Sequence, residues 1–212
     1  RQGKRGVGDW EVEVAPIGDM RGSILSLLGF GQIARAVAKR AQAFGTKCIA
    51  YAPTVSAWEA SIYGVELVDL QVAFSEADIV SVHLPLTDHT QHFVDASLIG
   101  LMKPTAVLVN ASRGPVVDER ALISALKRGK IAGAGVDVFT KEPPAPDNPL
   151  VNSPNVIWTP HAGGSTEVTL ERLGYGAMEQ MSWMAQGYWP RDVANPDVIP
   201  KIKLRSRDYP AR

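Results

Sequence analysis

The segment Gly29-Phe30-Gly31-Gln32-Ile33-Ala34 restricts the possible folds of this chain more than any other feature. It follows an apolar run at residues 24–28 that is typical of a buried strand. Apolar residues at helical spacing come next, and the expected helix face contains Ile33, Ala34, Val37, Ala38, Ala41 and Phe44. A strand, a glycine turn and a helix in this order predict a fingerprint that binds a dinucleotide.

Each small residue of the turn has a physical reason to be there. Gly29 permits a tight turn, Gly31 leaves the backbone open to a pyrophosphate, and Ala34 lets the helix pack close to the strand. The helix N-terminus then offers N–H groups and a partial positive charge to phosphates. Phe30, Gln32 and Ile33 lie between these positions and are expected to adjoin the cofactor. A glycine pattern by itself also suits an ordinary turn, and the flanking strand and helix favour the dinucleotide.

The residue after the second expected strand bears on the identity of the cofactor. An Asp or Glu about 20 residues beyond the glycine turn normally binds the ribose hydroxyls of NAD. Ala52 stands at that position, and no Arg follows closely to hold the 2′-phosphate of NADP. These residues therefore predict a dinucleotide without choosing between the two; NAD is the expected cofactor, and NADP stays possible.

The composition argues against several classes of partner. Lys plus Arg and Asp plus Glu number 22 each in the 212 residues, so the net charge gives no reason to expect binding to nucleic acid or membrane. Cys48 is the single cysteine and lies in an apolar strand pattern, which predicts a buried thiol. No signal peptide or apolar run of about 18 residues is seen, so we expect a cytoplasmic protein. No His, Cys and Asp cluster has metal-ligand spacing, and no metal is expected.

Strand and helix patterns alternate along the chain, which predicts parallel βαβ units in an α/β doubly wound, Rossmann-like sheet. After a polar stretch to about residue 61, Asp118 is expected to cap a helix that Gly129 closes. The expected strands are 24–28, 47–51, 65–68, 79–82, 106–109, 131–138 and 155–158, and the other helices are 69–76, 96–102 and 166–186.

Polar residues that directly follow strands are candidates for chemistry, because ligands of such sheets bind at the carboxyl ends of the strands. Arg113, Asp137, Glu142 and His161 satisfy this criterion. An Arg can grip a carboxylate with two hydrogen bonds, and a His can protonate a carbonyl oxygen. A carboxylate beside that His orients the ring and favours its charged form. This set suits the reduction of a 2-keto acid.

Other interpretations of these residues remain open. Arg113 could cap a helix or pair with Asp118, and Glu167 could replace Glu142 as the partner of His161. His83 is either a structural residue at a strand end or a neighbour of the cofactor. The remaining histidines, His89 and His92, are expected on a loop surface.

Several ordered motifs resemble the D-isomer-specific 2-hydroxyacid dehydrogenases, a family that includes phosphoglycerate dehydrogenases, glyoxylate/hydroxypyruvate reductases and the C-terminal-binding corepressors. The resemblance covers residues 21–186. The motifs that carry it are the glycine turn and residues 83–87, 110–114, 135–139, 142–143 and 159–161.

The resemblance implies roles for individual residues. Arg113 would bind the substrate carboxylate, Glu142 and His161 would form the acid/base pair, and Asp137 would bind the nicotinamide carboxamide. The remaining cofactor contacts would come from Leu84, Pro85, Thr90, Ala111, Gly163 and again His161. The implied reaction is hydride transfer between NAD(P) and a small D-2-hydroxy acid or 2-keto acid, in a homodimer.

The resemblance also implies a domain organisation. Residues 1–20 resemble an inter-domain connecting segment, 21–165 the dinucleotide-binding domain, 166–190 a helix that returns toward a substrate domain, and 191–212 form a basic tail. We expect most of that substrate domain to be absent from this sequence, so a truncated fragment or a natural short form with little turnover is one expectation. An NAD(H)-binding regulatory or scaffold domain, like that of the corepressors, is the alternative function.

Overall fold

The computed structural model describes residues 4–7, 10–13, 19–191, 193–201 and 203–206. It divides into two units, residues 1–161 and 162–212. Much of the predicted connecting segment and of the predicted tail lies outside the described residues. Within the connecting segment, β1 (Lys4–Val7) and β2 (Trp10–Glu13) pair as antiparallel strands.

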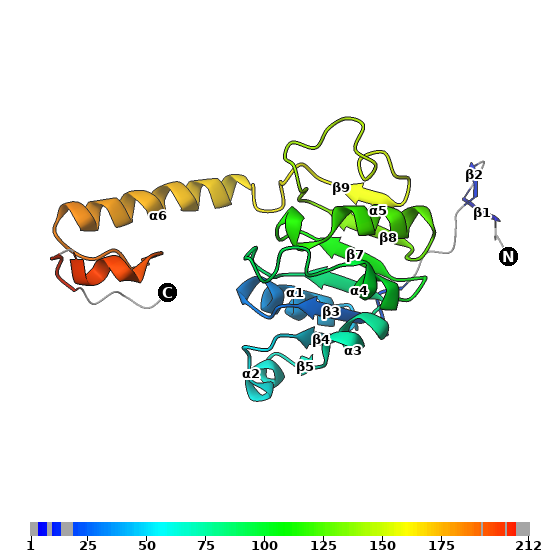
Figure 1. The fold of residues 1–212 in the computed structure, drawn as a ribbon, viewed down its shortest axis with the longest axis horizontal. Coiled ribbons are helices and arrows are strands. Elements are labelled where there is room, and N and C mark those ends of the chain that lie inside the picture. The colour runs from blue at the N-terminus through cyan, green and yellow to red at the C-terminus, as the bar shows by residue number, and fades with distance from the viewer. Residues whose placement is uncertain (1–3, 8–9, 14–18, 192, 202, 207–212) are drawn as a thin grey trace. The chain divides into compact units, whose positions relative to one another are not determined.

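The first unit is built on a seven-stranded parallel sheet with the strand order β5-β4-β3-β6-β7-β8-β9 (Figure 1). From β3 the chain proceeds outward to β4 and β5, then returns to β6 on the other side of β3. This reversal places a switch point between β3 and β6, and it confirms the predicted doubly wound sheet. The strands are β3 (Ile24–Leu28), β4 (Lys47–Tyr51), β5 (Glu66–Leu67), β6 (Ile79–Val82), β7 (Val107–Asn110), β8 (Gly133–Val136) and β9 (Val156–Trp158).

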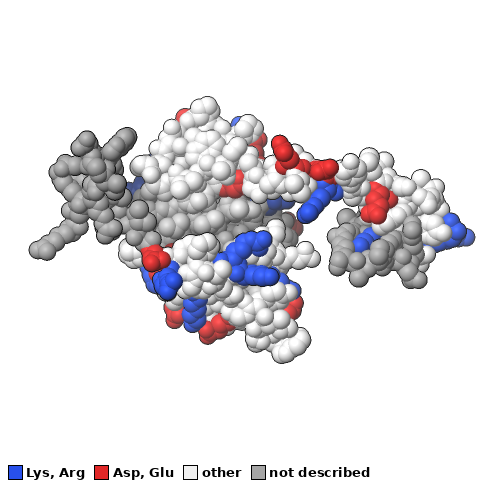
Figure 2. Space-filling view, turned by 180° about the vertical axis from the view of Figure 1, so that it is seen from behind, with Lys and Arg blue, Asp and Glu red and all other residues white. Residues whose placement is uncertain are grey.

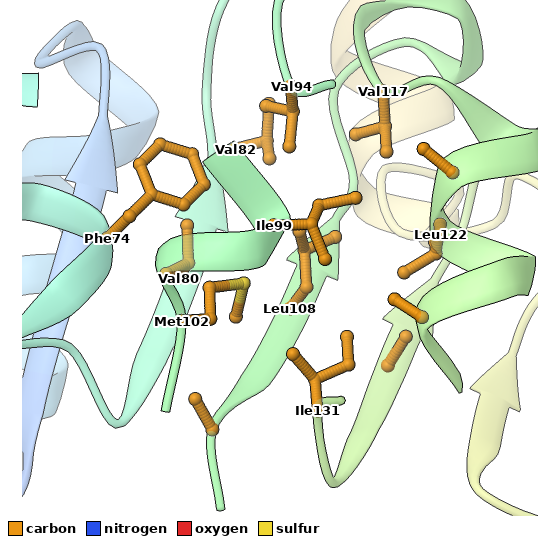
Figure 3. Packing of buried hydrophobic residues seen from close by; sticks show 14 of the residues in the cluster. Phe74, Val80, Val82, Val94, Ile99, Met102, Leu108, Val117, Leu122 and Ile131 are labelled. Atoms are coloured by element: carbon orange, nitrogen blue, oxygen red, sulfur yellow. The ribbon is translucent and has the colours of Figure 1, made fainter. Parts of the chain in front are cut away.

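Helices cover both faces of the sheet because successive strand side chains point to opposite faces. Leu25 and Leu27 belong to one buried cluster with residues of α1 (Gln32–Ala43) and α2 (Ala57–Ile62). Leu28 belongs to the other cluster, with α3 (Leu70–Ser75), α4 (Ala96–Leu101) and α5 (Glu119–Lys127). Figure 3 shows side chains of this second cluster pointing toward one another, among them Phe74, Val80, Ile99, Leu108 and Leu122.

Local signals set several helix ends as the sequence predicts. The Asp118 carboxylate accepts hydrogen bonds from the backbone N–H groups of Arg120 and Ala121, and Gly129 follows α5 with a φ of 62°. Cys48 is buried, as predicted, and burial raises the pKa of its thiol.

Two local expectations are wrong. The polar stretch before residue 61 contains α2, where Ser56 caps the helix by accepting from the Glu59 N–H. Its apolar pattern is weak because Ala60 is the one buried residue among its six. In α1, Ile33 and Phe44 are 73% and 64% exposed, whereas Ala34, Ala38 and Ala41 are buried. Ile33 borders a cleft in the first turn, and Phe44 lies at the C-cap, where the helical geometry ends.

The second unit contains α6 (Glu167–Ala185), whose N-terminus is capped by the Thr166 hydroxyl, and a 3-10 turn, η2 (Pro196–Lys201). None of the α6 residues is buried, and Leu170, Leu173, Met178 and Met181 are exposed. Within the described residues, no helix combines the length and apolarity needed to cross a membrane. On the face shown in Figure 2, Lys and Arg side chains lie in small groups with Asp and Glu between them.

Candidate active site

The glycine turn lies at the switch point of the sheet. Gly29 has a φ of 89°, and its N–H donates a hydrogen bond of 2.9 Å to the Tyr51 carbonyl at the end of β4. A Cβ at Gly29 would lie 3.1 Å from the carbonyl oxygen of His83, just past β6. The left-handed conformation and the close neighbours both favour glycine here. The turn is thus fixed between the ends of two neighbouring strands.

Gly31 differs from Gly29, because a Cβ added to it would meet no atom within 4 Å. It is the N-cap of α1, has no side chain to cap the helix, and is followed by a first turn without acidic residues. The N–H groups of that first turn have no intrahelical acceptors. Open space beside an uncapped helix N-terminus fits the pyrophosphate of a dinucleotide.

The Phe30 side chain packs in the core next to the glycine turn. It is 3% exposed, and its ring packs edge-on against Tyr63 with 5.7 Å between the centroids. Arg35 donates to the Phe30 carbonyl and forms an ion pair with Glu59 at 2.5 Å. The Phe30 side chain therefore has a packing role in the core, and the predicted contact of this residue with the cofactor stays a prediction.

A cleft of about 750 Å³ opens in front of the turn. Three segments line it, each following a different strand of the sheet: residues 31–34 after β3, 83–86 after β6 and 111–113 after β7. The cleft brings together seven of the residues predicted from the sequence: Gly31, Gln32, Ile33, Leu84, Pro85, Ala111 and Arg113. Its volume lies within the range of small-molecule sites.

Thr90 and His83 shape the loop beside this cleft. The Thr90 hydroxyl donates to the Pro85 carbonyl at 2.5 Å and accepts from the Thr87 N–H at 2.7 Å, so it braces the loop behind the lining residues. His83 itself lines the cleft, and its Nε2 lies 3.0 Å from the Ser81 hydroxyl. Burial lowers the pKa of His83 to about 4, because desolvation disfavours the charged ring. His89 and His92 are exposed.

Asn110 fixes the backbone that carries Arg113. Its buried side chain accepts from the Ser112 N–H and hydroxyl, at 3.1 and 2.9 Å, and donates to the Arg113 carbonyl at 3.1 Å. The Arg113 side chain is exposed, and its Nη1 donates to the Ser112 carbonyl rather than to Asp118. The guanidinium thus remains accessible at the edge of the cleft.

Gly114 joins this segment to the loop after β8. A Cβ on Gly114 would overlap the backbone carbonyl of Phe139 and crowd the Thr140 nitrogen. Glu119 of α5 holds the same loop, because its carboxylate accepts from the Thr140 N–H at 3.0 Å and from the Asn148 side chain at 2.9 Å. The close backbone approach brings the segment with Arg113 next to the loop that contains Glu142.

Glu142 and His161 are hydrogen-bonded, with 2.8 Å between the His161 Nδ1 and the Glu142 Oε2. The other carboxylate oxygen accepts from the Phe139 N–H at 3.0 Å. The hydrogen bond from His161 is the main cause that lowers the pKa of the Glu142 carboxyl, and the Phe139 N–H and the charge of Arg113 act in the same direction. The structure therefore pairs His161 with Glu142, while Glu167 belongs to the second unit.

Asp137 anchors the segment that ends in His161. It is 9% exposed, its carboxylate accepts the Thr159 hydroxyl, and its carbonyl accepts the His161 N–H at 2.8 Å. Gly163 lies in the second unit, so its predicted contact with the cofactor stays a prediction. Among the described residues, no three His, Cys, Asp or Glu side chains gather as a possible metal site.

Sequence reasoning missed the residues that hold the site in place. Asn110, Gly114 and Thr159 lie within the recognised motifs and could have been singled out there. Glu119 shows no sequence signal, because its partners Thr140 and Asn148 lie more than 20 residues away along the chain.

Comparison with known proteins places this site in a family. Residues 2–163 match the family described as the D-isomer specific 2-hydroxyacid dehydrogenase, NAD binding domain. The D-3-phosphoglycerate dehydrogenase of Methanocaldococcus jannaschii is 41% identical over 93% of this chain and 38% of its own length. The glyoxylate reductase of Korarchaeum cryptofilum is 40% identical over 91% of this chain and 59% of its own length.

Solved structures agree with the sequence comparison. The D-isomer specific 2-hydroxyacid dehydrogenase from Lactobacillus delbrueckii ssp. bulgaricus, in its NAD complexed form, superposes with a TM-score of 0.76 and 31% identity. The match covers 84% of this chain and 57% of that structure. The chain thus spans about 40–60% of the length of these relatives. It belongs to the D-isomer-specific 2-hydroxyacid dehydrogenase family and contains the NAD-binding domain of that family.

Proposed function

We propose that the protein containing this chain transfers a hydride between a nicotinamide dinucleotide and a small D-2-hydroxy acid or 2-keto acid. The observation that carries this proposal is the His161–Glu142 pair, at 2.8 Å, on the carboxyl side of the sheet that also holds the glycine turn. The positive charge of Arg113 helps to lower the pKa of the Glu142 carboxyl. A bound nicotinamide would supply or accept the hydride.

The geometry of the pair supports an acid/base role for His161. Since Nδ1 faces Glu142, the opposite ring nitrogen, Nε2, is the one to meet a substrate oxygen. His161 gives its proton to the carbonyl oxygen during reduction and removes it from the hydroxyl during oxidation. Glu142 keeps Nδ1 protonated and stabilises the charged ring, as its lowered pKa favours the carboxylate. Arg113 binds the substrate carboxylate through two parallel hydrogen bonds.

NAD(H) is the preferred cofactor in this proposal. A second hollow, of about 710 Å³, lies at the ends of β4 and β5, next to the glycine turn, and contains Ala52. Its described lining includes Glu66 and Asp69 and no Lys or Arg. Lys47 pairs with Glu66 at 3.1 Å, whereas the Asp69 carboxylate does not cap its own helix. Asp69 would therefore repel the 2′-phosphate of NADP(H), although Ala52 cannot anchor the ribose of NAD.

The exposed apolar side chains of α6 support a further part of the proposal. Leu170, Leu173, Met178 and Met181 are each at least 60% exposed. Exposed apolar area of this kind is typical of surfaces that contact another domain or chain. We propose that α6 packs against the substrate domain in the whole protein.

The reaction is tested by titrating the chain with NADH, followed by single-turnover mixing with glyoxylate or hydroxypyruvate at high protein concentration. Closure and water exclusion speed catalysis, and both require two walls of a cleft. Single turnover is chosen because it detects a slow reaction. We expect the NADH signal to decay, and the rate to fall by about a hundredfold or more in His161→Ala. His89→Ala, an exposed loop histidine, is the matched control. NADH binding without any His161-dependent oxidation would contradict the proposed reaction and favour a regulatory domain.

A further inference from the structure

The Arg35 side chain connects the glycine turn to α2. Its guanidinium lies over the rings of Phe30 and Tyr63, 5.4 and 5.0 Å from their centroids, which gives two cation–π contacts. Its Nη2 forms the ion pair with Glu59 of α2, at 2.5 Å. The Arg35 side chain is only 24% exposed, so these contacts replace much of its water. One side chain of α1 thus contacts both the turn and α2.

A hydrogen bond from Arg35 also sets the orientation of one peptide group in the turn. The Arg35 Nε donates to the Phe30 carbonyl at 3.2 Å. The peptide between Phe30 and Gly31 is trans, so its carbonyl and its N–H point in opposite directions. The Gly31 N–H therefore points away from Arg35, and among the described hydrogen bonds it has no acceptor. Since Gly31 lines the cleft, this N–H remains available to a ligand.

The other end of the connection, α2, lies between two segments that line the second hollow. Residues 51–53 and 55 precede α2 and residues 66–69 follow it, and all of them line this hollow. The C-terminal end of α2 is held to α1 by Gln42, whose Nε2 donates to the carbonyls of Tyr63 and Gly64 at 2.9 and 3.0 Å. A shift of α2 would therefore move the walls of the hollow relative to the glycine turn.

We infer that Arg35 is a positioning residue that keeps the second hollow at a fixed distance from the glycine turn, so that one dinucleotide can occupy both. The inference rests on the proposed function and places the adenosine in the second hollow. Two linked groups bind more tightly than the separate groups only when the spacing of their sites matches the linker. The affinity for a whole dinucleotide therefore depends on this spacing, whereas a ligand that occupies one site does not sense it.

Three variants separate this role from simple packing. Arg35→Met keeps the apolar stem and removes the donors and the charge, and Glu59→Gln removes the charge on the α2 side. Arg40→Met is the matched control, because Arg40 is also a cation of α1 but binds the Ala36 carbonyl of its own helix, at 2.8 Å. Each purified variant is titrated with NADH and with its two halves, AMP and reduced nicotinamide mononucleotide. Urea denaturation measures the stability of each variant in parallel.

We expect Arg35→Met to weaken NADH binding about tenfold, while the affinity for each half stays within about twofold of wild type. Loss of a positive charge alone would weaken the halves as well, since each carries a phosphate. Glu59→Gln should weaken NADH binding about threefold. Combining it with Arg35→Met should add no further loss, because the connection is already broken. Arg40→Met should bind all three ligands as the wild type does.

A loss of NADH affinity in Arg35→Met that is matched by an equal loss for either half would overturn the inference, because it would indicate local damage to one site. Unchanged NADH affinity would overturn it as well, even with a lower free energy of unfolding, because a purely structural arginine affects stability alone. Where a half binds too weakly to titrate, additive losses of NADH affinity in the double variant would contradict the inference, and non-additive losses would support it.

The Glu59→Gln variant decides the matter if Arg35→Met does not fold. Weaker NADH binding with unchanged binding of the halves would then support the inference, and wild-type NADH affinity would contradict it. A wild-type chain that binds neither NADH nor its halves would instead contradict the proposed function, and the inference with it.

Discussion

Two parts of the candidate site are built in different ways. At the glycine turn, the site consists of backbone and empty space, with Gly31 open to the cleft and α1 uncapped. At the proposed catalytic end, the site consists of side chains held by other side chains, with His161 bound to Glu142 and Thr159 bound to Asp137. Both ends lie at the carboxyl edge of one parallel sheet.

The difference shows how one sheet meets two chemical requirements. A pyrophosphate is recognised by N–H groups that the helix provides without any particular side chain. Proton transfer requires specific side chains at fixed positions, so their supports come from other parts of the chain. We therefore expect the turn to tolerate changes that do not fill space, and the catalytic end to depend on close backbone packing.

The largest expected effect is that of Gly114→Ala, which tests the packing at the catalytic end. Its Cβ would overlap the Phe139 carbonyl, and backbone cannot move aside as a flexible side chain can. We expect the free energy of unfolding to fall by about 3 kcal/mol or more, measured by urea denaturation. Gly100→Ala in α4 is the control, because its Cβ meets no atom, and we expect a gain of about 0.5–1 kcal/mol from helix propensity. Equal stability of the two variants would show that the loop adjusts freely.

The next largest effect is the pH dependence of stability caused by protonation of His83, which lies beside the glycine turn. The pKa of His83 in the folded state, about 4, lies below the ordinary histidine pKa of 6.5, so the unfolded chain binds more protons between these values. The contribution of the neutral His83 ring to the free energy of unfolding is complete above pH 6.5 and is lost as the pH falls toward 4. Between pH 7 and pH 5 we expect a loss of about 2 kcal/mol in the free energy of unfolding. His83→Gln should remove this slope and His89→Gln should keep it; a slope unchanged in His83→Gln would assign it to other groups.

The third effect is on binding rather than stability and is tested with Gly31→Ala. Its Cβ meets no atom of the chain, so we expect the free energy of unfolding to stay within about 0.5 kcal/mol of wild type. The same Cβ enters the space assigned to the pyrophosphate, and NADH affinity should fall about tenfold or more. Fluorescence titration measures this change. A stable variant with wild-type affinity would show that the cofactor does not approach Gly31.

The smallest effect is expected for Asp69→Asn, which tests the adenosine end. Removing the carboxylate relieves repulsion of a 2′-phosphate, so NADPH affinity should rise about threefold to fivefold while NADH affinity hardly changes. The exposed position of Asp69 and screening by salt keep this effect small. Titrations with both cofactors at low and high salt measure the ratio. If the ratio of NADPH to NADH affinity does not change at low salt, Asp69 does not contribute to cofactor preference.

Local patterns predicted much of the fold, because their causes act over a few residues. Asp118 and Gly129 marked the two ends of α5 through a cap and a left-handed glycine. The short helix α2 was missed because Ala60 alone is buried, which leaves almost no periodic signal. By its spacing, Ile33 was expected on the same helix face as Ala34 and Ala38, which are buried, but Ile33 borders the cleft and is exposed.

The sequence by itself determined the alternating α/β pattern, the glycine turn and the family, since strand alternation, caps and turns arise from neighbours along the chain. Only the tertiary structure decided that His161 pairs with Glu142, that Gly114 packs on Phe139, and that Glu119 holds Thr140. These contacts join loops that follow different strands or helices. Their geometry depends on how the strands pair and on which loops the sheet brings together, and no local pattern encodes those distances.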